Sequence, residues 1–337
     1  MQIRDGKDPV VLAADIGGTK THLGLFLMTG TRPDPLVIET YSSREVKRVE
    51  EIIQRFVSDQ KMPIRAACLG IAGPVHDGVC RTTNLPWFVS EAGIKRKFNW
   101  QQVRLINDLV ATAVAIPFLR KSELMVLNGA TLQKGQNIAL LAPGTGLGQA
   151  VLVFHQGRYV PLASEGGHVD FGPRNDDEIK LWRFLQKQFG HVSPERIVSG
   201  PGLVNIYSWL KQSTHTKEPP WLKKMFSEMD DGKVITEVGL RGEHPLCTEA
   251  LRVFVSVFGA VSGNLALTGT ARGGVFLGGG IPPKIVPALE QGYFMDAFTS
   301  KGRFSDYMEE IPVRVVLNER SALIGAARVA FDMIDKL

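Results

Sequence analysis

A strand, a turn rich in Gly and Thr, and a second strand occur in succession twice in the sequence. The first copy runs from Val10 to Leu27 and the second from Asn137 to Phe154. In both copies, short and continuous apolar runs flank the turn, which is typical of buried strands. Because the same unit occurs in both halves of the chain, the sequence predicts two similar lobes facing one cleft.

Neither turn matches a standard nucleotide motif. No G-x-x-x-x-G-K-[ST] segment occurs in the chain, and each turn leads into a strand rather than into a helix. Glycines still allow close approach of a ligand, and their N–H groups could bind phosphate, with Thr19 adding a hydroxyl. Asp15 could hold Mg²⁺ through water. An ordinary hairpin with a glycine turn is the alternative.

The stretch from Val103 to Asp108 predicts a short buried strand that ends in an amide and a carboxylate. Helix-forming residues follow at once. We expect Asp108 to be the base that takes a proton from a sugar hydroxyl. The alternative is a helix N-cap, because Asn and Asp are favoured at that position.

Two further segments carry polar side chains suited to a sugar. Glu165 and His168 flank two glycines, and both side chains can hydrogen-bond adjacent hydroxyls. A metal site is less favoured there, because no further His or Cys lies at ligand spacing nearby. Glu195 follows a proline and is either a first-turn charge of a helix or a third acidic ligand.

A third glycine turn, Gly278 to Gly280, follows an apolar strand and leaves a flat surface for a planar base. The loop from Thr83 to Trp87 offers hydrogen-bonding and stacking groups. A Trp beside a Pro is more often a packing anchor than a sugar platform. Residues 212–235 are polar and predict an exposed insertion, and Ser321 to Ile334 predicts a terminal helix that packs on the first lobe.

Composition limits the class of protein. With 337 residues and 44% hydrophobic composition, the chain is large enough to form two lobes, each with a buried core. The net charge of +5 suits an anionic ligand, and no dense Lys/Arg block interleaved with aromatics suggests nucleic acid.

The sequence also predicts a cytoplasmic protein. Its three cysteines form no C-x-x-C pair, and their odd number argues against a secreted disulfide framework. The N-terminal residues have mixed charge and no apolar signal core. The longest apolar tract, Leu251 to Leu267, is interrupted by polar residues and predicts a buried helix rather than a membrane span.

In their order and spacing, these motifs resemble the bacterial-type glucokinases of the hexokinase/actin/heat-shock ATPase superfamily. The resemblance covers almost the whole chain. The segments that carry it are Asp15–Thr19, Thr83–Trp87, Ile106–Asp108, Gly144–Gly148, Ser164–His168, Pro194–Arg196 and Gly278–Ile281.

The resemblance implies an α/β fold of two lobes, each with a ribonuclease-H-like mixed sheet flanked by helices, and an active-site cleft between them. We expect residues 1–118 plus about 318–337 in the small lobe and 119–317 in the large lobe. The implied activity is the ATP-dependent phosphorylation of D-glucose at its 6-hydroxyl, the first step of glycolysis, with ATP and Mg²⁺ as cofactors. Family members are often homodimers, and no nucleic acid or membrane partner is implied.

The resemblance also assigns residues. Asp108 would be catalytic and face the 6-hydroxyl. The sugar would be held by Asn84, Asn107, Asp108, Glu165, His168 and Glu195. The ATP phosphates would be held by Ala14, Asp15, Ile16, Gly17, Gly18 and Thr19, and by Gly144, Thr145 and Gly146 of the Gly144–Gly148 turn. Adenosine would lie near Gly278, Gly279 and Gly280.

One departure from related proteins is informative. The ROK-type sugar kinases and repressors carry a cysteine-rich zinc motif just after the E-G-G-H segment, but residues 169–196 contain no cysteine. No structural zinc is therefore expected. No helix-turn-helix precedes the first strand, which argues against a sugar-sensing repressor.

Three alternatives stay open. A kinase for fructose, mannose or an N-acetylated amino sugar would use nearly the same polar ligands. A non-catalytic sugar sensor would not need a working base. A chaperone-like ATPase would hydrolyse ATP without a sugar.

Overall fold

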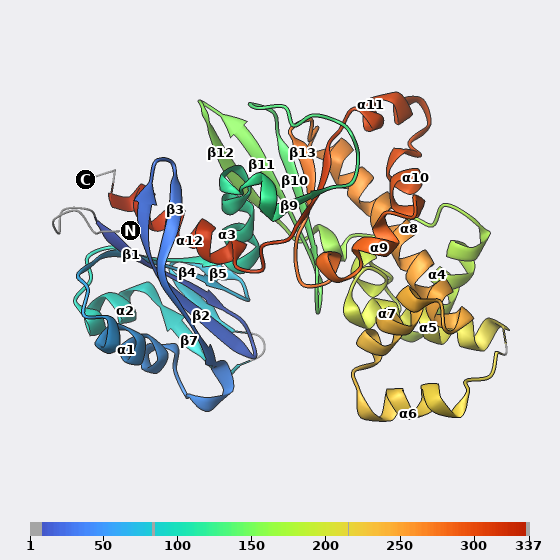
Figure 1. The fold of residues 1–337 in the computed structure, drawn as a ribbon, viewed down its shortest axis with the longest axis horizontal. Coiled ribbons are helices and arrows are strands. Elements are labelled where there is room, and N and C mark those ends of the chain that lie inside the picture. Colours follow the sequence, from blue (N-terminus) through green and yellow to red (C-terminus); the bar gives the residue numbers. More distant parts are fainter. Residues whose placement is uncertain (1–8, 83–84, 215, 335–337) are drawn as a thin grey trace. The chain divides into compact units, whose positions relative to one another are not determined.

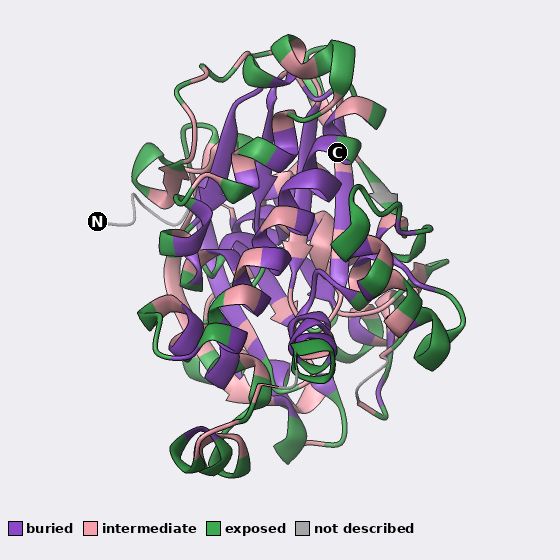
Figure 2. Ribbon diagram, turned by 90° about the vertical axis from the view of Figure 1, so that its right-hand side faces the viewer, coloured by how far each residue is buried: buried purple, intermediate pink, exposed green. Residues whose placement is uncertain are grey.

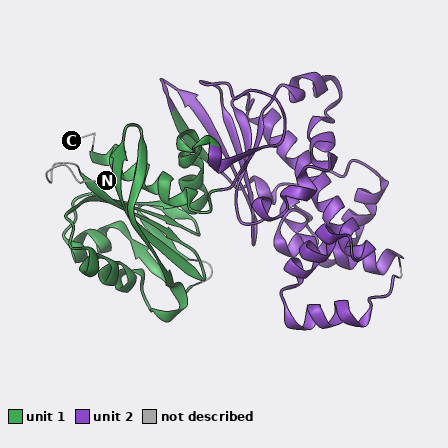
Figure 3. Cartoon of the chain, in the orientation of Figure 1, with its two compact units in different colours: residues 1–121, 159–162, 318–337 green, residues 122–158, 163–317 purple. Residues whose placement is uncertain are grey.

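The computed structural model describes residues 9–82, 85–214 and 216–334. The chain divides into two compact units (Figure 3). Unit 1 contains residues 1–121, 159–162 and 318–337, and unit 2 contains residues 122–158 and 163–317. The sequence-based division differs from these bounds by residues 119–121 and 159–162, which it placed in the larger lobe.

Unit 1 is built on a five-stranded mixed sheet in the order β3-β2-β1-β4-β8 (Figure 1). β1 pairs antiparallel with β2 and parallel with β4, and β8 lies parallel to β4. β2 also pairs antiparallel with β3. The strands are β1 (Val10–Ile16), β2 (Lys20–Thr29), β3 (Arg32–Ser42), β4 (Ile64–Ile71) and β8 (Val103–Asn107).

Side chains along β1 point alternately to the two faces of this sheet. Both sets are apolar, and helices cover both faces. Leu12 and Ala14 belong to the core cluster that includes α1 (Val49–Gln60) and α2 (Glu91–Phe98). Val11 and Ala13 belong to the cluster with α3 (Asp108–Ala115) and α12 (Ser321–Ile334). Strands buried on both faces explain the continuous apolar runs in the sequence. The C-terminal helix packs on unit 1, as its sequence pattern predicted.

A glycine allows α12 to lie directly against α3. A Cβ atom on Gly325 would overlap the carbonyl oxygen of Ala111 on α3. Both elements are well buried at this contact. We therefore expect Gly325→Ala to force α3 away from α12 and to cost about 1–3 kcal/mol of unfolding free energy.

Urea unfolding measures this cost, with Gly172→Ala as the control, because a Cβ on Gly172 meets no atom within 4 Å. Equal stability of the two variants would show that α3 and α12 are not in close contact.

A second, three-stranded sheet in unit 1 was not predicted. Its order is β5-β6-β7, from β5 (Val75–His76), β6 (Val79–Arg81) and β7 (Phe88–Ser90). Trp87, just before β7, is 3% exposed, and its indole nitrogen donates to the carbonyl oxygen of Val46 at 3.4 Å. Trp87 is thus a packing anchor, as favoured from the sequence, whereas Thr83 and Asn84 lie outside the described residues.

A six-stranded sheet has the order β12-β11-β10-β13-β14-β9 and belongs to unit 2, except for residues 159–162 of β12, which are grouped with unit 1. β10 pairs antiparallel with β11 and parallel with β13, and β13 lies parallel to β14. β9 adds an antiparallel edge strand beside β14. The strands are β9 (Leu124–Val126), β10 (Ile138–Pro143), β11 (Leu147–His155), β12 (Arg158–Ser164), β13 (Gly274–Leu277) and β14 (Val313–Val316).

The first five strands of this order follow the same plan as the sheet of unit 1. The β10–β11 hairpin takes the place that the β1–β2 hairpin takes in unit 1. The repeated strand–turn–strand pattern therefore predicted a real repetition of topology, and the predicted mixed α/β fold is confirmed.

The core of unit 2 forms around a long helix, α8 (Pro245–Thr268), whose residues are mostly buried. Figure 2 colours the buried residues of the chain purple. Among the described residues, it is the one helix long and apolar enough to cross a membrane. Its burial confirms the buried helix predicted from the tract Leu251–Leu267. The other α-helices are α4 (Asp176–Phe189), α5 (Gly200–Thr214), α6 (Pro220–Glu228), α7 (Asp231–Arg241), α9 (Val286–Leu289), α10 (Tyr293–Thr299) and α11 (Ser305–Glu309).

The prediction of an exposed insertion at residues 212–235 holds for most of its described residues but not for those that pack on the core. Leu222 on α6 and Val234 and Ile235 on α7 are fully buried in the unit 2 core. These three apolar residues face inward, whereas Trp221 and Met229 of the same segment are exposed. The short 3₁₀ helices of the chain are η1 (Ser43–Glu45), η2 (Ile116–Phe118), η3 (Lys121–Glu123), η4 (Gly166–His168), η5 (Pro194–Arg196), η6 (Pro282–Lys284) and η7 (Gly302–Phe304).

Candidate active site

The junction of β8 and α3 separates the roles of two adjacent polar residues. Asn107 ends β8 and caps α3: its Oδ1 accepts from the backbone N–H of Leu109 at 2.9 Å and of Val110 at 3.4 Å. Its Nδ2 donates to the carbonyl oxygen of Gly73 at 3.2 Å. The N-cap of α3 is therefore Asn107 and not Asp108, which was the alternative for Asp108 in the sequence. Asp108 is the first residue of the helix.

The surroundings of Asp108 suit a base. Its Oδ1 accepts one backbone hydrogen bond, from Leu109 at 2.9 Å. Burial raises the pKa of this carboxyl above its usual range, and hydrogen bonds to the carboxylate oppose the rise. A base works best when its pKa approaches the working pH, so partial desolvation of Asp108 favours proton abstraction.

Asp15 lies at the same edge of the unit 1 sheet. It is near the carboxyl end of β1, where it pairs with Gly70 of β4, and Ile71 pairs with Asn107 of β8. The carboxyl ends of parallel strands are the usual position of ligand sites in such sheets. Burial raises the pKa of Asp15 to about 7, and the Asp108 carboxylate adds to the rise.

Asp15 and Asp108 suit Mg²⁺, which keeps several of its waters, better than they suit a metal ion whose ligands all come from the protein. Within the described residues, no hydrogen bond reaches the Asp15 carboxylate, and like charge from Asp108 disfavours its ionised form. A divalent cation would relieve this repulsion. Mg²⁺ typically keeps several waters and binds one or two carboxylates together with substrate phosphates. No group of three or more His, Cys, Asp or Glu side chains is arranged to hold a metal in the described part of the chain.

The first glycine turn is shorter than the motif Asp15–Thr19 that contains it. β1 extends to Ile16 and β2 begins at Lys20, so only Gly17, Gly18 and Thr19 form the turn. Ala14 and Ile16 point their side chains into the core and could offer a phosphate only backbone groups.

Ser43 stabilises this turn, although no sequence motif indicated this role. Its N–H donates to the carbonyl oxygen of Thr19 at 2.9 Å, and its Oγ donates to that of Gly17 at 2.9 Å. Ser43 lies far along the chain, after β3, and no local pattern could have linked it to the turn.

The second glycine turn, Gly144 to Gly146, joins β10 to β11 in unit 2. The N–H of Gly144 donates to the carbonyl oxygen of Gly146 at 2.8 Å. The N–H of Gly200, the first residue of α5, donates to the carbonyl oxygen of Gly144 at 2.8 Å. The amino end of a helix therefore lies against this turn, which favours binding of an anion nearby.

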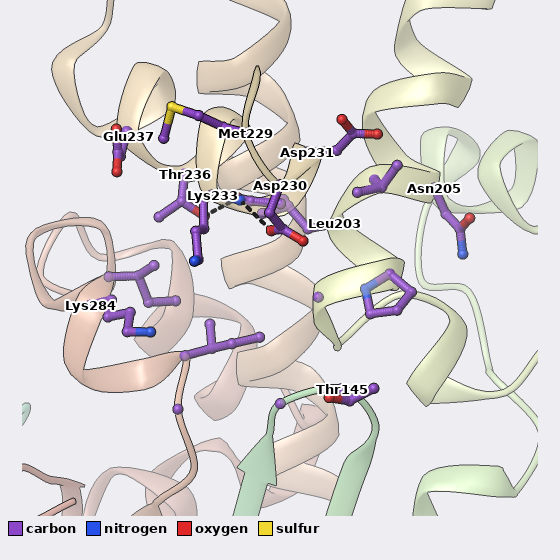
Figure 4. A pocket seen from close by; sticks show the side chains of 18 of the residues that line it. Thr145, Leu203, Asn205, Met229, Asp230, Asp231, Lys233, Thr236, Glu237 and Lys284 are labelled. Carbon is purple, nitrogen blue, oxygen red and sulfur yellow. Dashed lines mark hydrogen bonds between the residues drawn. The ribbon is translucent and has the colours of Figure 1, made fainter. Parts of the chain in front are cut away.

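A pocket of about 1010 Å³ opens beside the second turn, within unit 2 (Figure 4). Gly144, Thr145 and Gly280 line it together, so the structure joins the turns expected to hold phosphate and adenosine. Gly278 and Gly279 do not line it. Gly279 has a φ of +81°, and a Cβ there would come within 2.7 Å of the carbonyl oxygen of Pro143, so it shapes the turn instead.

Sequence reasoning missed the opposite wall of this pocket, which α7 forms. Asp230 caps α7 by accepting from the N–H of Lys233 at 3.0 Å, and both residues line the pocket (Figure 4). Lys284 brings a second positive charge from η6. An Asp four residues before the apolar pair Val234-Ile235 is a helix-start signal that could have identified α7.

Two of the predicted sugar ligands meet in unit 2. His168 belongs to η4 and Glu195 to η5, and His168 Nδ1 lies 3.8 Å from Glu195 Oε1. Glu165 immediately precedes η4 and has an exposed side chain. His191 contacts the carbonyl oxygen of His168 through its Nε2 at 2.9 Å and supports this segment.

The two glycines of the E-G-G-H segment are explained by close packing on β11. A Cβ on Gly166 would lie 2.5 Å from Oε1 of Gln149, and one on Gly167 would overlap the carbonyl oxygen of Leu147. Residues without Cβ atoms therefore let η4 lie against the start of β11. Asn84, the remaining predicted sugar ligand, is outside the described residues.

Comparison with known proteins identifies relatives along nearly the whole chain. A family model described as Glucokinase matches residues 12–333. A glucokinase of Synechocystis sp. is 39% identical, over 94% of this chain and 96% of the relative. One of Escherichia coli O139:H28 is 36% identical, over 94% of this chain and 95% of the relative.

Solved structures agree with the fold. A glucokinase from an Antarctic psychrotroph superposes with a TM-score of 0.86 at 31% identity, over 96% of this chain and 99% of that chain. The glucokinase of Balamuthia mandrillaris in complex with glucose has a TM-score of 0.79 at 23% identity, over 98% and 95% of the two chains.

Proposed function

The chain belongs to the glucokinase family, and we infer that it is an ATP-dependent glucokinase, which transfers a phosphoryl group to the 6-hydroxyl of D-glucose. Glucokinases at 35–39% identity over nearly the full length support this activity. The observation that carries the mechanism is the position of Asp108. It is the first residue of α3, and because Asn107 caps that helix, the Asp108 carboxylate is not needed as the cap.

We assign Asp108 as the catalytic base. Phosphoryl transfer requires mainly positioning and charge stabilisation. The carboxylate would orient the 6-hydroxyl towards the γ-phosphate and accept its proton as the new O–P bond forms. The raised pKa of Asp108 supports this role, because it makes the carboxylate a stronger base than an exposed Asp.

The donor would bind the two glycine turns and the pocket of unit 2. Backbone N–H groups of Gly17–Thr19 and Gly144–Gly146 are suited to phosphate oxygens. Adenosine would occupy the pocket bounded by Gly280 and α7, with Lys233 and Lys284 supplying positive charge. Asp15 would hold Mg²⁺ through water, and the ion would supply charge neutralisation on the phosphates.

Polar side chains of the predicted sugar motifs would hold the sugar. We assign Asn107 and Asp108 of unit 1 and Glu165, His168 and Glu195 of unit 2 to glucose, and Asn84 by family resemblance alone. Carboxylates and imidazole accept hydrogen bonds from hydroxyls, and Asn can both donate and accept.

Removing one sugar ligand should weaken binding measurably. For Glu165→Gln or His168→Ala, we expect the Kd for glucose to rise about 10- to 100-fold, because hydrogen bonds that involve charged groups contribute about 1.5–3 kcal/mol. Isothermal titration calorimetry measures the change. Affinity equal to that of the parent would remove the altered residue from the proposed sugar site.

The position of phosphorylation gives a direct test of the proposed function. With Mg-ATP and glucose, the product should be glucose 6-phosphate, detected by a coupled glucose 6-phosphate dehydrogenase assay. 6-Deoxyglucose should compete with glucose yet release no ADP. Release of ADP with 6-deoxyglucose at the rate seen with glucose would contradict transfer to the 6-hydroxyl.

We further propose that the protein is a cytoplasmic homodimer acting in glycolysis. All three cysteines are buried and unpaired, which suits a reducing compartment. The dimer rests on family resemblance, and sedimentation equilibrium at micromolar concentration tests it: a mass near 37.0 kDa would indicate a monomer instead.

A further inference from the structure

The carboxylate of Glu195 contacts two different parts of unit 2. Its Oε2 accepts a hydrogen bond from the backbone N–H of Leu147 at 2.9 Å. Its Oε1 lies 3.8 Å from Nδ1 of His168. The side chain is 25% exposed, so one oxygen is engaged with the protein while the carboxylate remains open to a ligand.

Leu147 is the residue at which the second glycine turn ends and β11 begins. The carboxylate lies directly on this turn, because a Cβ on Gly146 would come within 2.5 Å of Oε2. A glycine at position 146 is therefore what permits the contact between Glu195 and the turn.

The same segment also holds the other end of the turn. Glu195 and Gly200 lie five residues apart, and the N–H of Gly200 donates to the carbonyl oxygen of Gly144 at 2.8 Å. Between them, Ser199 Oγ donates to the carbonyl oxygen of Glu195 at 2.7 Å and accepts from the N–H of Gly202 at 3.0 Å. Residues 195–200 therefore hydrogen-bond to both ends of the turn, and Ser199 links this segment to α5 through the N–H of Gly202.

We propose that Glu195 is a positioning residue for the nucleotide as well as a ligand of the sugar. Through Oε2 it fixes the backbone of the turn whose Gly144 and Thr145 line the pocket. The inference rests on the proposed function, because it assigns that turn to the donor phosphates. It adds that one carboxylate serves both substrates.

Substitutions of Glu195 can separate its two roles, which are to position the turn and to bind the sugar. The Leu147 N–H requires an acceptor within reach and no charge, so the amide oxygen of Gln can replace the carboxylate. Ala removes the acceptor, and Asp keeps the charge but is one methylene shorter. Loss of a hydrogen bond to a charged acceptor loosens the turn and leaves its N–H without this partner.

The experiment measures binding of Mg²⁺ and a non-hydrolysable ATP analogue by calorimetry, in the absence of sugar. We expect Glu195→Ala and Glu195→Asp to raise the Kd for the analogue about 5- to 30-fold. Glu195→Gln should remain within about threefold of the parent. All three variants should bind glucose more weakly, and unfolding curves establish that each is folded.

Glu165→Ala is the matched control. Glu165 is also assigned to the sugar, but its side chain is exposed and makes no contact with the turn among the described residues. It should lose affinity for glucose and keep the nucleotide affinity of the parent. If Glu195→Ala does not fold, the comparison of Glu195→Asp with Glu195→Gln makes the same distinction.

Unchanged nucleotide affinity in Glu195→Ala and Glu195→Asp would overturn the inference and leave the proposed function intact. A loss of nucleotide affinity in Glu195→Gln that is larger than the loss in Glu195→Asp would also overturn it, since charge rather than the hydrogen bond would then matter. A parent protein that binds no nucleotide would overturn the proposed function together with the inference.

Discussion

Asp108→Asn should lower the turnover number about 10²- to 10⁴-fold and leave most of the affinity for glucose. The amide has nearly the same shape and can still hydrogen-bond the sugar, but it cannot accept the proton of the 6-hydroxyl. The N-cap of α3 is Asn107, so the substitution leaves the start of the helix intact. Steady-state kinetics and glucose calorimetry on the same preparation separate the two effects.

Asp59→Asn is a suitable control for this variant. Asp59 is an exposed residue of α1 in the same unit, and it should retain the turnover of the parent. Turnover of Asp108→Asn within tenfold of the parent would remove Asp108 from the role of base.

Asp15→Asn should change the pH dependence of stability. The pKa of Asp15 in the folded protein is raised to about 7 from an ordinary value of 3.8. A raised carboxyl pKa contributes stability that is present below the ordinary value and is lost as the pH rises through about 7. Asn cannot ionise and avoids this loss. The variant should therefore be more stable than the parent above pH 7, by up to ~4 kcal/mol.

Urea unfolding at pH 5, 7 and 8.5, without nucleotide or Mg²⁺, tests this expectation. The stability advantage of Asp15→Asn should shrink as the pH falls from 8.5 to 5, while Asp59→Asn shows no such trend. An advantage that is constant across this range would show that Asp15 is not held with a raised pKa. The same variant should lose most of its activity, since the amide is a poor ligand for Mg²⁺.

The parts of the fold predicted from the sequence are those encoded locally. Apolar runs flanking the glycine turns identified the β1–β2 and β10–β11 hairpins, because buried strands need continuous hydrophobic sequence. The junction of β8 and α3 was found from an amide and a carboxylate between a strand and a helix. The assigned roles of these residues remain predictions for the variants described above.

The parts that were missed depend on contacts between distant residues. Ser43 holds the first turn from beyond β3, and Glu195 holds the second turn from η5. Neither contact leaves a periodic pattern in the chain. The pocket wall on α7 was missed because most of this polar segment is exposed and only a few of its residues pack on the core. Only its spacing of apolar residues, Val234, Ile235 and Val238, showed the buried face.

We infer that this chain transfers a phosphoryl group from ATP to glucose. The most direct test is ADP release from Mg-ATP with glucose, mannose, fructose, N-acetylglucosamine or no sugar. Strong release with glucose, and little with the other sugars or without sugar, is the predicted result. Release that does not depend on sugar would indicate an ATPase, no release would indicate a sugar sensor, and preference for another sugar would indicate a different hexose kinase; each would contradict the claim.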